Sequence, residues 1–265
     1  MLDLTTYPDI SYGSGLNAEL DPEERRRLLK WEIALGYRIF ASQRWGQMGD
    51  GHITARDPIL TDHFWVLGYG IAFHQATIHN LALVAPDGRI VEGPTAGGVN
   101  HAGYHIHFPI YDSLPEVGGA AHTHTQWGTP FSAEVRPMEP ISQESTTFVF
   151  DQALYEGTDL EVDTTDGGYR IAKSMVGKGM HGGAARLCIL RNHGLLTAGS
   201  GPGAAVGFFV MAERVAEVHM KARDAKPISA ESARIAREDL TQHGGGRVQF
   251  HWLCKRHVPD QSVVD

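Results

Sequence analysis

Two histidines, His122 and His124, stand two residues apart in the stretch AAHTHTQWG, and this spacing can present two imidazoles to one cation. The apolar residues before them predict a buried strand, on which alternate residues point to the same face. A His-x-His pair also occurs by chance on protein surfaces. The pair alone therefore leaves a metal site and a surface pair both open.

A third histidine, His193, ends a second apolar run, LCILRNHG, and is followed by the turn-forming Gly194. A histidine at the end of a strand can reach a cleft that it shares with the first pair. Three imidazoles with one open position suit zinc, iron or another first-row divalent metal. The competing interpretation is that His193 only caps a turn.

Helices must support these segments. Asp21 and Pro22, with two glutamates directly after them, are typical of a helix start, and apolar residues at helical spacing continue the pattern. Another long helix is expected at 202–223, with Glu213 on its exposed, polar side. We expect further helices at 102–113, at 169–175 and from about residue 229.

Short strands alternate with the helices. The run APDGRIVEG predicts a hairpin whose turn is Pro86-Asp87-Gly88. No repeat or linker interrupts the pattern, which favours one α/β domain with helices on a mostly antiparallel sheet. We expect strands at 52–56, 63–67, 80–84, 118–124 and 186–192. The stretch that follows the His-x-His strand, up to about residue 143, is expected to be rich in loops.

The composition excludes several classes of protein. The 265 residues are 42% apolar and 20% charged, as in an ordinary globular protein, and the net charge of −8 argues against nucleic acid as a partner. No apolar run is long enough to cross a membrane, and the first residues lack a leader pattern, so we expect a cytoplasmic protein without a membrane partner. Two cysteines give no disulfide framework.

Several stretches together resemble the class II aldolase/adducin family. They are GDGHITARDP, HAGYHIHFPIY, AAHTHTQWGTPFSA and ILRNHGLLTAG, in this order, and the resemblance spans roughly residues 23–225. It implies a class II aldolase-like α/β/α fold with a central, mostly antiparallel sheet flanked by helices. We expect residues 1–265 to form a single domain, with N- and C-terminal extensions around this core.

The resemblance also implies a site and an assembly. One divalent metal ion per subunit would be held by His122, His124 and His193, and zinc, Fe(II), manganese and cobalt all remain open. The protein would be a homotetramer, with active sites at its subunit interfaces, and would act on a small-molecule substrate.

Some residues depart from the aldolase pattern. Gly103 stands where the sugar-phosphate aldolases carry a catalytic Glu and the epimerases an Asp. His101 and Ala102 replace the serine pair that binds phosphate in the aldolases, and the stretch LGYGIAF replaces their phosphate turn. A phosphate site needs converging N–H, hydroxyl or cationic donors. The sequence therefore argues against a phosphorylated substrate and against the aldolase proton shuttle.

A replacement acid is predicted further along the chain. Gln143 and Glu144 resemble the Gln-Glu pair of the methylthioribulose-phosphate dehydratases, whose Glu is the general acid/base. We predict Glu144 as the catalytic acid/base, the alternative being a surface contact.

Other polar residues are candidates for contact with the substrate or for support of the metal ligands. His101 and His105 share a helix face, and His107 would pack behind the site. The candidates are His101, His105, His107, Gln143 and Asn192. Alternatively, His101 and His105 are only a partly exposed pair on the surface, and Asn192 only holds a turn.

Three functions compete. The first is a metal-dependent lyase that cleaves, decarboxylates or dehydrates a small non-phosphorylated carbonyl, 2-oxo or 2-hydroxy acid. The second is a non-haem Fe(II) oxygenase that oxidatively decarboxylates an aromatic 2-oxo or 2-hydroxy acid in secondary metabolism. The third is a non-catalytic, adducin-like interaction module, which the three retained histidines disfavour.

Overall fold

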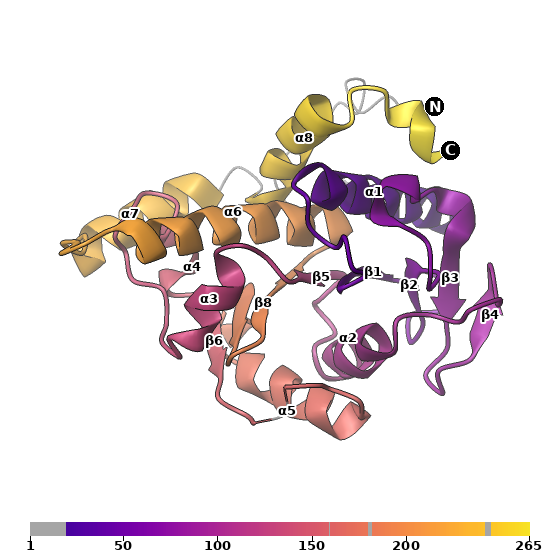
Figure 1. Ribbon diagram of the computed structural model, residues 1–265, viewed down its shortest axis with the longest axis horizontal. Coiled ribbons are helices and arrows are strands. Elements are labelled where there is room, and N and C mark those ends of the chain that lie inside the picture. The colour runs from indigo at the N-terminus through magenta and orange to yellow at the C-terminus, as the bar shows by residue number, and fades with distance from the viewer. Residues whose placement is uncertain (1–19, 159, 180–181, 242–244) are drawn as a thin grey trace.

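The computed structural model describes residues 20–158, 160–179, 182–241 and 245–265. In these residues a sheet with the order β4-β3-β2-β1-β5-β8-β7-β6 lies between two layers of helices (Figure 1). Neighbouring strands are antiparallel except for β6 and β7, which are parallel. The strands are β1 (Gly51–Arg56), β2 (Phe64–Leu67), β3 (Leu81–Val84), β4 (Ile90–Glu92), β5 (Gly119–Thr123), β6 (Gln152–Tyr155), β7 (Leu187–Leu190) and β8 (Gly194–Gly199).

Helices cover both faces of the sheet. The long helices α1 and α6 lie on one face, and α2 and α5 lie on the other (Figure 1). This arrangement confirms the predicted α/β/α fold with a mostly antiparallel central sheet. The α-helices are α1 (Pro22–Ser42), α2 (His101–Ser113), α3 (Gly128–Ala133), α4 (Thr146–Val149), α5 (Thr165–Met175), α6 (Pro202–Lys221), α7 (Ala230–Thr241) and α8 (Gly246–His257).

Local sequence explains where the longer helices begin. The Asp21 carboxylate accepts hydrogen bonds from the backbone N–H groups of Glu23 and Glu24, as its place before Pro22 predicts. The Asn100 side chain likewise accepts from the Gly103 N–H and begins α2. None of the helices in the described part of the chain has the length and apolar composition needed to span a bilayer.

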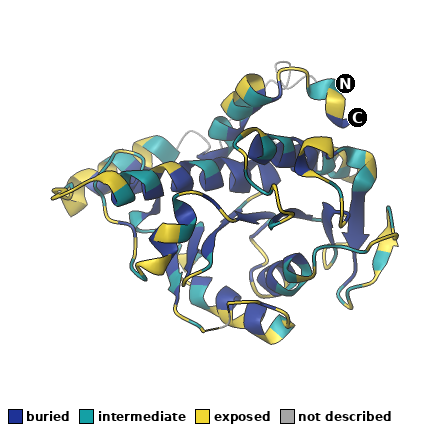
Figure 2. Ribbon diagram, viewed as in Figure 1, coloured by how far each residue is buried: buried dark blue, intermediate teal, exposed yellow. Residues whose placement is uncertain are grey.

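Two apolar cores lie on the two faces of the sheet, and alternate strand residues supply them. On β8, Leu195 joins the core under α1 and α6, whereas Leu196 joins the core under α2 and α5. Figure 2 shows the strands buried between the helical layers. His122 pairs with Leu196 and with His52 across the sheet, so all three side chains lie on the α2 side.

Three sequence predictions need correction. The strand that carries His122 ends at Thr123, so His124 lies beyond it. The strand expected at 186–192 covers only 187–190, because Leu190 already pairs with Gly194 and the residues between them form a tight turn. The stretch expected to be loop-rich contains α3, and part of it is thus helical.

Candidate metal centre

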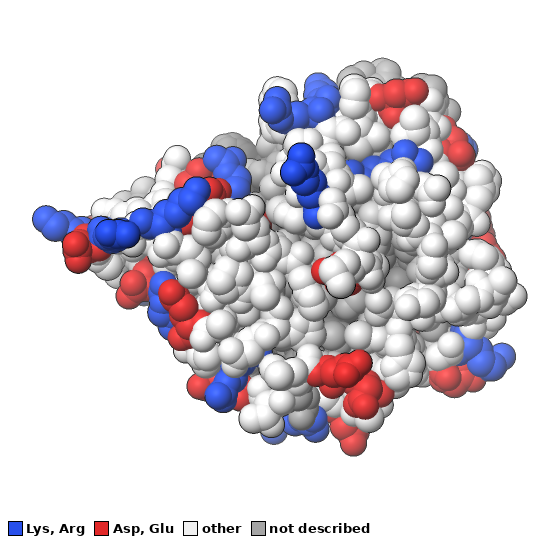
Figure 3. Space-filling view, in the orientation of Figure 1, with Lys and Arg blue, Asp and Glu red and all other residues white. Residues whose placement is uncertain are grey.

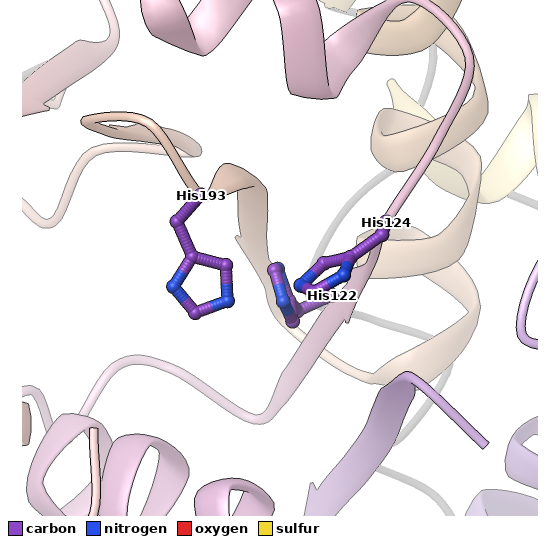
Figure 4. A group of neighbouring side chains, drawn as sticks. All are labelled: His122, His124 and His193. Carbon is purple, nitrogen blue, oxygen red and sulfur yellow. The ribbon is translucent and has the colours of Figure 1, made fainter. Parts of the chain in front are cut away.

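Three histidines from two segments converge at the end of the sheet. His122 is the last residue but one of β5, His124 follows that strand, and His193 lies in the turn between β7 and β8 (Figure 4). Each offers a ring nitrogen, and these atoms lie within 4.8 Å of one another. The ring centroids are 4.8–5.4 Å apart. The structure thus brings together the three residues that the sequence predicts as metal ligands.

The β7–β8 turn positions His193. Asn192 adopts a left-handed backbone (φ 55°), and its N–H donates to the carbonyl of Ser132 on α3. The next residue, Gly194, has φ 158°. A Cβ at Gly194 would lie 3.4 Å from Cε1 of His122 and 3.9 Å from Cδ2 of His124. These are ordinary van der Waals distances, so Asn192 and Gly194 shape the turn through their backbone conformations.

The backbone fixes the orientation of the His122 ring. Its Nδ1 is 2.7 Å from the carbonyl oxygen of Leu195, which can only accept, so Nδ1 carries the hydrogen. The lone pair is then on Nε2, where it is free to bind a metal. The carboxylate of Asp50 lies 3.7 Å from Nδ1 of His124, farther than a hydrogen bond, and favours the same ring orientation less strongly.

The surroundings favour neutral imidazoles, the form that binds metals. Burial lowers the pKa of His122 well below its ordinary value, and positive charge on His193 would lower it further. Burial and the neighbouring His124 lower the pKa of His193 to about 4. No carboxylate belongs to this ligand group in the described residues. Three neutral nitrogens fit zinc and Fe(II) alike.

A buried glutamate holds the segment after His124. Glu213 of α6 is 5% exposed, so the prediction of a surface position was wrong. Its carboxylate accepts from the Thr125 hydroxyl at 2.6 Å and from the backbone N–H groups of Trp127 and Gly128 at 2.9 and 2.7 Å. All three donors belong to the turn after β5. Because buried donors need an acceptor, the glutamate of α6 is buried here.

One cavity adjoins the triad, and a second shares a tryptophan with it. The first, of about 470 Å³, is lined by His124 and by Gln43, Arg44 and Trp45, which follow α1. The second, of about 660 Å³, shares Trp45 with it and reaches Gly51 at the start of β1. Aromatic side chains provide much of its wall: Tyr37, Trp45, Tyr69 and Phe73. Part of this wall comes from LGYGIAF, the stretch that replaces the phosphate turn.

Comparison with known proteins now identifies the family. A sequence model of the Class II Aldolase and Adducin N-terminal domain matches residues 32–220. The chain belongs to the class II aldolase and adducin family.

Two curated relatives of this aldolase-family chain come from Streptomyces. The 4-hydroxy-3-prenylphenylpyruvate oxygenase/4-hydroxy-3-prenylbenzoate synthase of Streptomyces roseochromogenus subsp. oscitans is 33% identical over 227 residues, covering 83% of this chain and 78% of that protein. Decarboxylase NovR of Streptomyces niveus is 33% identical over 250 residues, covering 91% of this chain and 89% of that protein.

A solved structure shares the fold. The L-fuculose 1-phosphate aldolase from Glaciozyma antarctica PI12 is 29% identical and superposes with a TM-score of 0.78, covering 91% of this chain and 94% of that one. Together with the histidine triad, these relatives make this aldolase-family chain a metal-dependent enzyme with lyase or oxygenase activity. The alternative of a non-catalytic module is set aside.

Gly103 stands where the family resemblance places the acid of the sugar-phosphate aldolases. A Cβ on Gly103 would lie 3.2 Å from Cβ and Cγ of His52. The imidazole of His52 therefore lies directly against the position at which those aldolases carry their acid. Sequence reasoning does not identify His52, which is 2% exposed and packs its ring 5.0 Å from that of His122.

His107 supports His52 from α2. Its Nε2 is 2.8 Å from Nδ1 of His52, and its Nδ1 is 2.5 Å from the Thr54 hydroxyl, which in turn lies 2.7 Å from the Tyr111 hydroxyl. Burial lowers the pKa of His107 to about 3. His107 thus lies behind the site, as predicted, and its partner is His52.

The other predicted residues lie apart from the triad. Glu144 is half-exposed, 3.9 Å from Arg214, in a groove along α6. Gln143 is exposed. His101 is exposed and His105 half-buried, with their Nε2 atoms 3.1 Å apart on α2. The roles of these four residues in catalysis or substrate binding stay predictions.

Proposed function

We propose that this enzyme decarboxylates a non-phosphorylated aryl 2-oxo or 2-hydroxy acid at an Fe(II) ion held by His122, His124 and His193, with dioxygen as co-substrate. The oxygenase interpretation is preferred to simple lyase chemistry for two reasons: aromatic side chains line the neighbouring cavity, and Gly103 provides no acid at the position that the aldolases use. The observation that carries the proposal is a cavity with aromatic walls that shares Trp45 with the groove of His124, beside a ligand group that contains only histidines among the described residues.

The cavity supports an aryl substrate. Trp45 lines both this cavity and the groove that contains His124, which supports a substrate with its ring in the cavity and its acid group toward His124. The hollowed middle of this face carries few charged side chains, whereas Lys and Arg gather near α6 and α7 (Figure 3). The groove beside His124 has one arginine in its lining, Arg44, which can meet a single acid group of the substrate.

The chain's own groups bind and orient the substrate. A divalent ion in the triad supplies Lewis-acid chemistry and, as Fe(II), redox chemistry. Trp45 and Tyr69 exclude water from the ring of the substrate, and Gly103 provides no carboxyl group for the aldolase proton transfer. The two Streptomyces relatives, named as an oxygenase/synthase and a decarboxylase, support decarboxylation of an aromatic 2-oxo acid.

The test begins with metal analysis of protein purified without oxygen. The iron-loaded enzyme is then given phenylpyruvate, 4-hydroxyphenylpyruvate and mandelate, and oxygen uptake and CO₂ release are recorded together. We expect both gases to change in proportion for at least one aryl acid. CO₂ release without oxygen uptake, most active with zinc, would instead support the lyase. Neither change with any acid would refute the proposal.

We also propose that the active form is a homotetramer, as the family resemblance implies. Several large apolar side chains are available for subunit contacts: Met48 is 92% exposed, Trp252 64% and Tyr69 59%. Light scattering coupled to size-exclusion chromatography tests this directly, and a monomeric active enzyme would contradict it.

A further inference from the structure

We infer that His52 is a fixed hydrogen-bond donor whose Nε2 binds a substrate oxygen beside the metal centre. This inference rests on the proposed function for the nature of the substrate. It gives a residue of β1 a role in substrate binding, next to Gly103, where the resemblance places the aldolase acid.

The first support is the place of His52 beside the triad. It pairs with His122 across β1 and β5, and the two rings lie 5.0 Å apart on the same side of the sheet. His52 is not part of the group whose ligand atoms lie within 4.8 Å of one another. It is therefore a neighbour of the metal ligands and does not belong to the ligand set.

The second support is the direction in which the ring points. Its Nδ1 faces His107 of α2 at 2.8 Å, and its Cβ, Cγ and Cδ2 face Gly103. The two nitrogens of an imidazole diverge, so Nε2 points away from α2. Among the described residues no hydrogen bond is made by Nε2, and although the residue is only 2% exposed, Nε2 does not belong to the fully buried side-chain atoms without a partner. A ligand atom can therefore reach it.

The third support is a chain of hydrogen bonds that fixes which nitrogen carries hydrogen. One direction of this chain begins at the Tyr111 hydroxyl, whose neighbour in it is the Thr54 hydroxyl. The hydrogen of Tyr111 is donated to Thr54, Thr54 donates to Nδ1 of His107, and Nε2–H of His107 donates to Nδ1 of His52. Each direction leaves one hydrogen without an acceptor among the described residues: this one leaves the Nε2–H of His52, and the reverse leaves the hydroxyl hydrogen of Tyr111, which is 3% exposed and packed in the core. The first direction is favoured, because the Nε2 of His52 is not fully buried and can meet a ligand.

The consequence is a preset donor. With Nδ1 of His52 accepting, the ring hydrogen is on Nε2, which then donates to an oxygen placed between His52 and the triad. A carboxylate or carbonyl oxygen of a 2-oxo acid is such an acceptor, and a bond to a charged oxygen is stronger than one between neutral groups. No reorientation of the ring is needed when the substrate binds.

The experiment measures binding, not turnover. Zinc-loaded protein under nitrogen is titrated calorimetrically with two probes, phenylpyruvate and oxalate, in the wild type, His52→Leu and His52→Gln. Leucine fills the space but cannot donate, whereas the glutamine amide can. We expect His52→Leu to raise the Kd of both probes about tenfold or more, His52→Gln to recover much of that loss, and all three proteins to keep one zinc. His63→Leu, at a half-buried histidine paired with Asp62, is the control and should bind as the wild type does.

The two probes separate this inference from the proposed function. Oxalate binding that depends on His52, without phenylpyruvate binding, would refute the aryl substrate and retain the donor. Equal oxalate affinity in His52→Leu and wild type, or no oxalate binding at all, would overturn the inference. Loss of zinc from His52→Leu would make His52 a ligand and overturn it as well.

A second variant covers the case in which His52→Leu does not fold. Gly103→Ala places a methyl group 3.2 Å from the His52 ring and pushes the ring aside without removing it. We expect folded, zinc-containing protein with weaker oxalate binding. Unchanged oxalate affinity in Gly103→Ala would contradict the inference.

Discussion

Asp57 allows the strongest test of what holds α1 against the sheet. Its side chain is fully buried at the end of β1. One oxygen accepts from Nε of Arg26 and from the Trp65 indole, both at 2.7 Å. The other accepts from Nη2 of Arg26 at 2.8 Å and from the backbone N–H groups of Ile59 and Leu60 at 2.9 and 2.6 Å. The perturbation is Asp57→Asn, which changes one oxygen to an NH₂ group.

The structure gives the size of the effect. The new NH₂ group must face either Arg26 with Trp65 or Arg26 with two backbone N–H groups, so donors oppose donors in both orientations. The charge of Arg26, whose side chain is 16% exposed, also loses its partner. Removing one partner of a buried ion pair costs about 3–5 kcal/mol. For a chain of this size that lowers Tm by roughly 6–20 °C.

The effect depends on pH in a defined direction. Burial alone would raise the pKa of Asp57, but Arg26, the backbone N–H groups and Trp65 together outweigh it and lower the pKa. The carboxylate therefore contributes stability above the unfolded-state pKa of about 3.9 and loses it as the pH falls through the folded-state value. The difference between wild type and Asp57→Asn should be complete at neutral pH and shrink in acid.

The assay is urea unfolding of metal-free protein, in steps from pH 7 to pH 3. The matched control is Asp87→Asn, because Asp87 also accepts from Nε of an arginine, Arg89, and from a backbone N–H, but at an exposed site. We expect no measurable change for the control. An equal urea midpoint for Asp57→Asn and Asp87→Asn at pH 7, or a difference that grows in acid, would refute the reasoning.

Three further predictions concern the site. His193→Ala should reduce bound metal from one equivalent to about a tenth or less after dialysis, measured by elemental analysis, and full metal content would remove His193 from the ligand set. Glu213→Gln should lower zinc affinity by about tenfold, because an amide cannot accept all three hydrogen bonds of the turn after His124. A chelator competition assay checks this, with Glu217→Gln, at a half-buried glutamate paired with Lys221, as control, and equal affinities would contradict it. Glu144→Gln should lower kcat by about 10²-fold if Glu144 is the acid/base, and an unchanged kcat at constant KM would assign it only to the ion pair with Arg214.

The sequence predicts the fold and the metal ligands because both depend on local patterns. The start of α1 follows from Asp21 and Pro22, and strand periodicity locates β5 and β7 near His122 and His193. The ends of these strands were less accurate, since Thr123 and Leu190 are fixed by their partners in the sheet. Register between strands is a property of the whole sheet and leaves little signal in one segment.

The part of the site that sequence reasoning missed depends on contacts between distant segments. His52 lies in an ordinary strand pattern, and only the pairing of β1 with β5 places it beside His122. Two signals existed: Gly103 removes a side chain from α2, and His52 and Thr54 alternate on one face. The burial of Glu213 was equally hidden, because its partners lie in the turn after β5 and not on α6.

The three-residue turn between β7 and β8 has a consequence for protein engineering. Both strands of this hairpin are hydrogen-bonded to further strands, so the sheet holds the ends of the turn in place. The length of the turn therefore sets how far His193 extends toward His122 and His124. Inserting or deleting one residue between Leu190 and Gly194 would change the bite angle of the site while the sheet stays intact, which offers a route to altered metal preference.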